Sequence, residues 1–179
     1  VMTMPPKSRR VLVKSVSDSK VTMTELVLPQ HTNSLGGVFG GVIMSWIDVA
    51  GAIAAQRHSG RVCVTASVDE LHFLRSVKKG YIVNISSQVT CVHRTSCEVM
   101  VRVKAENPIM RECFHTVKAF LTFVAVDSDG RPVEMPKLKV ESKKEKELEA
   151  EAKIRREHRK KLKKLLMDEN DHSESSDES

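Results

Sequence analysis

The sequence lacks any apolar run long enough to cross a membrane, and it lacks a signal peptide with a charged start and an apolar middle. Aromatic residues are scarce, at 4% of 179 residues, and none interleaves with the basic stretch 155–164. Nucleic acid is therefore not expected as a partner. We expect a cytoplasmic protein with no membrane span; a mitochondrial location is the alternative if a transit peptide precedes Val1.

The spacings typical of metal sites and disulfide frameworks are also missing. The four cysteines, Cys63, Cys91, Cys97 and Cys113, form no C-x-x-C pair and fall inside apolar runs that are typical of strands. We therefore expect reduced, buried thiols. The histidines are scattered without the spacing of metal ligands, so we expect neither a metal ion nor another cofactor.

Charge and composition divide the chain into three parts. Residues 1–136 carry 16 Lys or Arg and 11 Asp or Glu, a formal net charge of +5, which suits an anionic ligand with phosphates. Residues 137–167 are highly charged and rich in helix formers, which predicts a solvated helical extension. Residues 168–179 are acidic and Ser-rich, which predicts a disordered tail.

Hydrophobic periodicity predicts one strong helix among several strands in residues 1–136. Residues 41–57 are apolar on every face, which indicates a buried helix, and Gly60 is its expected cap. Alternation predicts strands over 11–16, 21–28, 61–74, 81–92, 97–105 and 111–126. We expect the first two to form a hairpin, and residues 127–130 to form a turn. The pattern predicts an α+β fold, an antiparallel sheet wrapped around a central buried helix.

Asp48 stands out within this helix because its neighbours are apolar or small. An unpaired carboxylate is costly to bury, so an acid in such a setting is usually paired or functional. The stretch 35–41 just before the helix contains four glycines, and a glycine turn of this kind exposes backbone N–H groups at the positive end of the helix dipole. Such an acid can attack a carbonyl, and such N–H groups can stabilise its oxyanion.

Five segments together match a known pattern. They are HTNSLGGVFGG (31–41), WIDVAG (46–51), VTASVD leading into FL (64–74), RTSCEV (94–99) and AFLTFVA (119–125). In this order they resemble the hotdog-fold acyl-CoA thioesterases, especially the cytosolic acyl-CoA hydrolases and their small bacterial single-domain relatives. The resemblance covers residues 9–136, and the charged helix after Pro136 resembles the extension that ends the eukaryotic members.

The resemblance implies a catalytic role for Asp48, either as general base on a water or as nucleophile towards the thioester carbonyl. It implies that the N–H of Gly41, and with it that of Gly40, stabilises the oxyanion. Some members have Asn and His where this chain has Gly37 and Phe39. Asn33 is then the nearest candidate for a second polar group in the site.

The resemblance also implies where the substrate lies. Thr65 matches a position that lines the pocket in relatives. A second group matches the region that approaches coenzyme A, either at its phosphates and pantetheine or at its nucleotide: Arg94, Thr95 and Ser96, with Arg75, Lys78 and Lys79 as further basic candidates. One protomer is too small to enclose such a site, so we expect a homo-oligomer. A dimer is the minimum and a trimer of dimers is the expected assembly, with the acid of one subunit beside its partner's glycine-rich loop.

We therefore predict an acyl-CoA thioesterase that hydrolyses fatty acyl-CoA to free fatty acid and coenzyme A, with coenzyme A entering as part of the substrate. The alternative is a non-catalytic acyl-CoA-binding or sensing protein of the same fold, which would not need Asp48. A hotdog dehydratase ranks lower, since that chemistry usually needs a His beside the acid, and the glycine-rich loop holds none beyond His31.

Overall fold

The computed structural model describes residues 12–69 and 71–174, of which residues 167–174 are described by their backbone alone. The chain forms two compact units, Val1–Val140 and Glu141–Ser179. The first unit contains a five-stranded antiparallel sheet in the order β2-β4-β5-β6-β3. Its strands are β2 (Val21–Leu26), β3 (Val62–Val68), β4 (Ile82–Val92), β5 (Ser96–Asn107) and β6 (Glu112–Val126).

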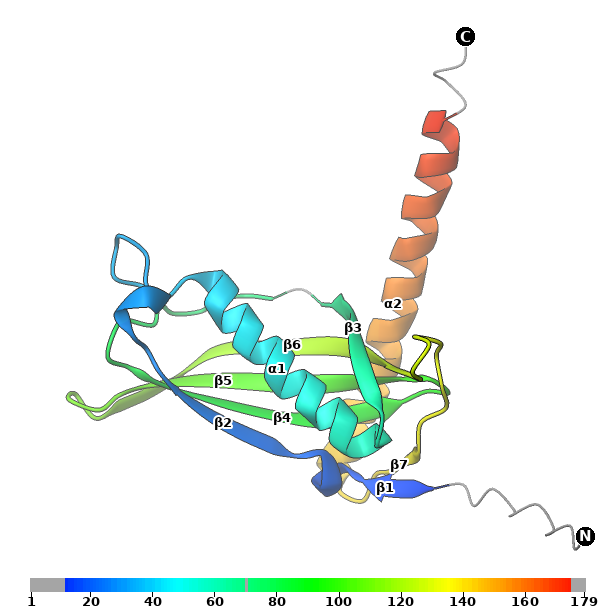
Figure 1. The fold of residues 1–179 in the computed structure, drawn as a ribbon, viewed down its shortest axis with the longest axis horizontal. Coiled ribbons are helices and arrows are strands. Elements are labelled where there is room, and N and C mark those ends of the chain that lie inside the picture. Colours follow the sequence, from blue (N-terminus) through cyan, green and yellow to red (C-terminus); the bar gives the residue numbers. More distant parts are fainter. Residues whose placement is uncertain (1–11, 70, 175–179) are drawn as a thin grey trace, which may run out of the picture. The chain divides into compact units, whose positions relative to one another are not determined.

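The helix α1 (Gly40–Ser59) lies across one face of this sheet (Figure 1). Its buried side chains, among them Ile43, Ile47 and Ala54, pack against inward-facing residues of the central strands such as Val99 and Val101. The helix ends at Gly60, whose φ of 65° is left-handed and whose N–H donates to the Gln56 carbonyl. The predicted α+β fold, with its curled antiparallel sheet and the Gly60 cap, is confirmed.

The prediction of a helix buried on all sides is wrong for the single chain. Met44 and Val49 are 45% and 48% exposed, and Gly41 and Ser45 also face solvent. These positions recur every three to four residues, so they form one continuous open face. Apolar composition indicated that the helix avoids water, but not that this chain alone would cover it.

The predicted N-terminal hairpin is also wrong. β1 (Val13–Ser15) pairs in parallel with β7 (Lys137–Lys139) in a separate two-stranded sheet. Between β1 and β2 the chain makes a 3₁₀ turn in which the Asp18 carboxylate accepts the Ser15 N–H at 2.9 Å. The buried Ser19 hydroxyl accepts the Val89 N–H at 3.0 Å, which ties this turn to β4 and directs β1 away from β2.

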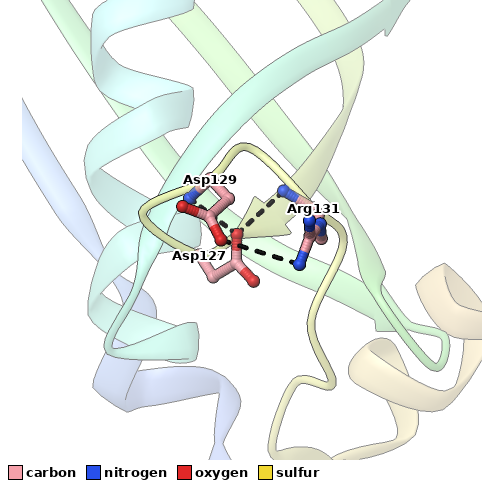
Figure 2. A network of polar contacts seen from close by, with 3 residues as sticks. All are labelled: Asp127, Asp129 and Arg131. Carbon is pink, nitrogen blue, oxygen red and sulfur yellow. Dashed lines mark hydrogen bonds and ion pairs between the residues drawn. The ribbon is translucent and has the colours of Figure 1, made fainter.

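The predicted turn after β6 is present, and its polar contacts are shown in Figure 2. One Asp127 carboxylate oxygen accepts the N–H groups of Asp129 and Arg131, each at 2.9 Å, and the Arg131 guanidinium lies 3.6 Å from the Asp129 carboxylate. Gly130 has a φ of 76°, the left-handed geometry that favours glycine. The turn returns the chain towards β7.

The second unit contains the helix α2 (Lys143–Glu174). The sequence placed the start of the helical extension at residue 137 and its end at 167. The structure instead has β7 directly after Pro136, and the helix continues to Glu174 in the stretch predicted to be disordered. Residues 175–179 of that predicted tail lie outside the described residues. Of the helices in the described part of the chain, none is long and apolar enough to cross a membrane.

Candidate active site

Asp48 in the middle of α1 faces the edge strand β3. The Thr65 hydroxyl donates a hydrogen bond of 2.6 Å to Asp48 Oδ1. The register of β3 against β6 shifts between Thr65 and Ser67, so Ala66 forms a bulge next to Thr65. Bulges are frequent beside active sites, where they re-aim a side chain. The hydroxyl engages one oxygen of the carboxylate, so the other remains available to a water molecule or a substrate.

The glycine-rich loop before α1 is organised by Asn33. Its side-chain carbonyl accepts the N–H groups of Leu35 and Gly37 at 3.0 and 3.2 Å, and its own N–H donates to the Gly37 carbonyl at 2.8 Å. A Cβ atom on Gly37 would lie 2.9 Å from the Ser76 hydroxyl. The loop therefore has little room for the Asn that some relatives carry at this position, and Asn33 holds the loop from its base.

The loop presents two backbone donors at the start of α1. Phe39 precedes the first turn and provides no side-chain cap, and the Val42 N–H already donates to the Phe39 carbonyl. In the described residues, no acceptor is found for the N–H of Gly40 or Gly41. The free donors of a first helical turn lie where the helix dipole favours negative charge. This is the geometry that an oxyanion requires.

Asp48 and the donors at the helix start are well separated in one chain. Gly41 and Asp48 are seven residues apart in the same helix, which corresponds to about 10 Å along its axis. A reacting carbonyl must lie about 3 Å from both its attacking group and its oxyanion donors. The Asp48 and Gly41 of one chain are therefore too far apart for a direct attack by Asp48 on a carbonyl held at Gly41.

The basic candidates fall into two groups at opposite ends of β4. Arg94, Thr95 and Ser96 form the turn into β5, whereas Lys78 bridges to Gly37 just before β4 begins. The 11 residues of β4 separate the two groups by about 35 Å. One coenzyme A nucleotide cannot contact both groups of a single chain.

One basic group lies near the Asp48–Thr65 pair, and the other lies near the glycine-rich loop. The turn at Arg94 lies near Thr65, because Cys97 pairs with Phe123 and Phe123 pairs with Thr65 across neighbouring strands. Lys78 lies beside the glycine-rich loop through its bridge to Gly37. Arg75, three residues earlier, has its guanidinium 5.3 Å from the centre of the Phe114 ring.

Other nucleophile candidates are placed unfavourably. Burial raises the pKa of the Cys63 and Cys97 thiols, which disfavours the reactive thiolate. All four cysteines are free thiols, as expected, and Cys91 is also buried. Cys113 is exposed, so the prediction that all four thiols are buried is wrong for this residue. Among the described residues, no group of three His, Cys, Asp or Glu side chains could hold a metal ion.

His31 supports the loop. Its Nδ1 accepts the Leu28 N–H at 3.2 Å, and its ring packs edge-on against Trp46 with the centroids 5.2 Å apart. Its backbone carbonyl accepts the Phe39 N–H at 2.9 Å, so the residue links both ends of the loop. These contacts give His31 a structural role in the loop that precedes α1.

The close approach of Gly51 to Phe123 was not predicted from the sequence. A Cβ atom on Gly51 would lie 2.8 Å from the Phe123 ring, so the helix can reach the sheet only with glycine at this position. The signal was available, since an isolated glycine inside an apolar helix usually has a packing reason. The bulge at Ala66 had no comparable signal in the sequence.

Known proteins are similar to this chain in sequence. The thioesterase superfamily matches residues 35–110. The Bacillus subtilis protein named uncharacterized acyl-CoA thioester hydrolase YkhA is 41% identical over 128 residues, which are 72% of this chain and 74% of that protein. Rat cytosolic acyl coenzyme A thioester hydrolase is 34% identical over 144 residues, and this chain spans 38% of its length.

Solved structures agree with these matches. An apo-hexameric acyl-CoA thioesterase has a TM-score of 0.82 at 39% identity, covering 85% of this chain and 97% of that one. Staphylococcus aureus acyl-CoA hydrolase, solved with butyryl coenzyme A, coenzyme A and coenzyme A disulfide, has a TM-score of 0.80 at 32% identity, covering 92% of this chain and 99% of that one. Three variants of this enzyme have also been solved, in which an aspartate, a threonine or an asparagine is replaced by alanine.

The fold, the acid on the central helix and the glycine-rich helix start are thus found in a chain whose relatives are acyl-CoA thioester hydrolases. This chain belongs to the thioesterase superfamily, as a hotdog-fold acyl-CoA thioesterase.

Proposed function

We propose that this protein hydrolyses fatty acyl-CoA to free fatty acid and coenzyme A at a site shared by two protomers, without a cofactor. The observation that carries the proposal is the 2.6 Å hydrogen bond from Thr65 to Asp48, which fixes one carboxylate oxygen and leaves the other for the reaction. Support also comes from the uncapped N–H groups of Gly40 and Gly41, which suit the developing oxyanion.

In this reaction Asp48 acts as general base or as nucleophile. As a base, it takes a proton from a water molecule while the water oxygen attacks the thioester carbonyl carbon. The carbonyl electrons move to the oxygen held by the N–H groups of Gly40 and Gly41. Their return breaks the carbon–sulfur bond, and the departing thiolate takes up a proton. As a nucleophile, Asp48 would attack the carbonyl carbon and the carbon–sulfur bond would break, which releases the coenzyme A thiolate and leaves an acyl-aspartyl anhydride; water would then hydrolyse the anhydride to the free fatty acid and the Asp48 carboxylate.

The spacing of three residues supports this assignment. In the Staphylococcus aureus enzyme the replaced asparagine lies 15 positions before the replaced aspartate, and the replaced threonine lies 17 positions after it. Asn33, Asp48 and Thr65 have the same spacing in this chain. We propose that Asn33 contributes by holding the glycine-rich loop in shape, since its side-chain carbonyl accepts two N–H groups of that loop.

A second copy of the chain would complete the site. The separation of about 10 Å between Gly41 and Asp48 along the helix favours a carbonyl that lies between the acid of one protomer and the loop of another. Two surfaces are open for that contact: the face of α1 at Met44 and Val49, and the outer edge of β3. An unpaired sheet edge needs a cover, and edge-to-edge pairing with a second β3 provides one. We propose a dimer as the minimum and a trimer of dimers as the assembly.

The first experiment separates catalysis from binding. Asp48→Asn should abolish thiol release from acyl-CoA esters while calorimetry still detects coenzyme A binding, because the substitution removes the base and preserves the shape of the side chain. Asp129→Asn, in the exposed turn after β6, is the matched control and should retain full turnover. Unchanged turnover in Asp48→Asn would show that hydrolysis does not depend on Asp48, whereas absence of turnover in the wild-type protein would favour the non-catalytic acyl-CoA-binding alternative.

The second experiment tests whether the site is shared. Gly41→Pro removes one N–H donor at a helix position that tolerates proline, and the variant alone should be inactive. Co-expressed with Asp48→Asn, it should recover about a quarter of wild-type activity, because half of randomly paired dimers are mixed and each has one intact site of two. No recovery, with mixed dimers verified by two affinity tags, would place the whole site in one protomer.

A further inference from the structure

The geometry points to a membrane-binding surface on the middle of α2, built for lipid bilayers that carry anionic headgroups. This basic amphipathic segment comprises residues 153–166. It contains eight Lys or Arg and one Glu, a formal net charge of +7. The charge is local to this stretch, because residues 143–152 before it carry three Lys and four Glu, and residues 168–174 after it are acidic without a Lys or Arg.

The apolar side chains of the segment share one face of the helix. Ile154, Leu162, Leu165 and Leu166 are 60%, 58%, 62% and 53% exposed. At 100° per residue they occupy an arc of about 120°, the width of a stripe that packs against a core or a bilayer, and Arg155 and His158 lie within the same arc. Four large aliphatic side chains that remain in water on one face need an apolar partner.

Seven of the eight cationic side chains flank or oppose that face, whereas Arg155 lies within it. Lys160, Lys163 and Lys164 project from the opposite side, and Lys161 lies at its border. Long side chains at such a border can extend their charged ends to the headgroups while the aliphatic residues enter the acyl region. An apolar face together with a Lys- and Arg-rich polar face is the pattern of helices that lie in the membrane interface.

Other occupants fit this surface less well. A second copy of the helix would bring two segments of net charge +7 together, which repel each other. Nucleic acid would neutralise the charge and leave the four aliphatic side chains in water, and the segment has no aromatic residue for base stacking. An anionic bilayer satisfies both faces at once.

The test is flotation of the full-length protein with vesicles of phosphatidylcholine, with and without phosphatidylserine. Binding is expected to the anionic vesicles alone and should weaken as salt is raised. Lys160→Gln/Lys163→Gln/Lys164→Gln should lower the partition coefficient about 150-fold, at roughly 1 kcal/mol for each lysine near an anionic surface. Leu162→Asn/Leu165→Asn should also release the protein, because it removes half of the apolar face.

The matched control lies on the same helix. Lys143→Gln/Lys144→Gln/Lys146→Gln removes three lysines outside the segment and should leave vesicle binding unchanged. Equal binding to both vesicle types, full binding by either segment variant, or an equal loss in the control would overturn the proposal. So would tighter binding to single-stranded RNA that the Leu162→Asn/Leu165→Asn variant retains. The readout needs no turnover, so its failure is separate from any failure of the hydrolase proposal.

Discussion

Gly51 on α1 lies so close to Phe123 on β6 that a Cβ atom there would be 2.8 Å from the ring. Phe123 is the register partner of Thr65, and Gly51 lies one turn beyond Asp48 on the helix. The close approach of helix and sheet at this point thus brings Asp48 to within 2.6 Å of the Thr65 hydroxyl. Gly51 is a positioning residue for the site, although it contacts none of the reacting groups.

Gly51→Ala should therefore lower both the stability and the turnover of the protein. The added methyl group overpacks the interface, which typically costs about 1–3 kcal/mol and outweighs the gain in helix propensity. Urea unfolding and steady-state kinetics measure the two effects. Phe123→Leu in the same chain should restore part of both. A Gly51→Ala variant as stable as the wild type would refute the close-packing argument.

Thr65 offers a graded test of its hydrogen bond to Asp48. Thr65→Val keeps the shape of the side chain and removes the donor, so kcat should fall while KM changes little, because the bond orients the acid and does not hold the nucleotide. Thr65→Ser keeps the donor and should retain most of the turnover. If Thr65→Val keeps wild-type turnover, the hydrogen bond does not matter for the reaction; if both variants lose activity equally, the methyl group of Thr65 is needed as well as its hydroxyl.

Arg94 is expected to act on binding. Arg94→Ala should raise KM more than it lowers kcat, because a phosphate contact is remote from the thioester carbonyl. The control is Arg131→Ala, which removes another exposed turn arginine, one that pairs with Asp129. Kinetics with acyl-CoA and with a shortened acyl-pantetheine thioester give the sharper comparison, since the short substrate should not distinguish Arg94→Ala from wild type. A pure loss of kcat would contradict this role.

His58 should make stability depend on pH. Burial lowers the pKa of this fully buried imidazole below its ordinary 6.5, and its Nε2 lies 2.8 Å from the Pro136 carbonyl. As pH falls through 6.5 the unfolded chain takes up a proton that the folded chain refuses, so the free energy of unfolding decreases. Above that pH the contribution of His58 to the free energy of unfolding is fully retained.

Urea unfolding between about pH 5 and pH 8 measures this effect, since histidine titrates in that range. His58→Gln, which keeps a donor and does not titrate, should flatten the acid side of the profile. His115→Gln, at an exposed position, should leave the profile as it is in the wild type. Parallel profiles for all three proteins would show that His58 does not carry the pH dependence.

Removal of residues 141–179 should leave a folded and active protein. The unit Val1–Val140 contains the five-stranded sheet, α1, every residue of the hydrophobic core cluster and every residue of the candidate site, so we expect it to fold without the second unit. Cooperative urea unfolding checks the fold, and thiol release checks the activity. Light scattering measures whether the truncated chain keeps its assembly. If the truncated chain keeps its fold and loses its assembly, α2 has a structural role in the oligomer.

Features that depend on local periodicity were predictable from the sequence. The helix at 41–57 and the strands after it follow from apolar spacing, and the cap at Gly60 follows from the left-handed geometry that glycine adopts. Features that depend on distant partners were not predictable. The parallel pairing of β1 with β7 joins the two ends of the domain, and it depends on side-chain contacts of Asp18 and Ser19 that have no periodic signal.

Some features of the candidate site were likewise predictable from the sequence, and others were not. The resemblance pointed to Asp48, Thr65 and the glycines of the loop as site residues, but their separation in one chain depends on helix geometry in three dimensions. The link between Thr65 and Asp48 depends on how closely α1 approaches β6, which a single methyl group at Gly51 would change. Apolar patterning predicted the helix. The exposure of one of its faces was not predictable, because it depends on which other parts of the chain pack against the helix.

The position of β3 at the end of the sheet also affects the order in which the domain can form. β3 is complete at Val68, but β6, its only partner in the described sheet, begins at Glu112. During synthesis both Asp48 and Thr65 leave the ribosome before the strand that fixes their distance exists. Closing so long a segment is slow, because its loop entropy is lost before the contacts form. The edge of the sheet that carries Thr65 is thus among the last parts of the nascent chain to become ordered.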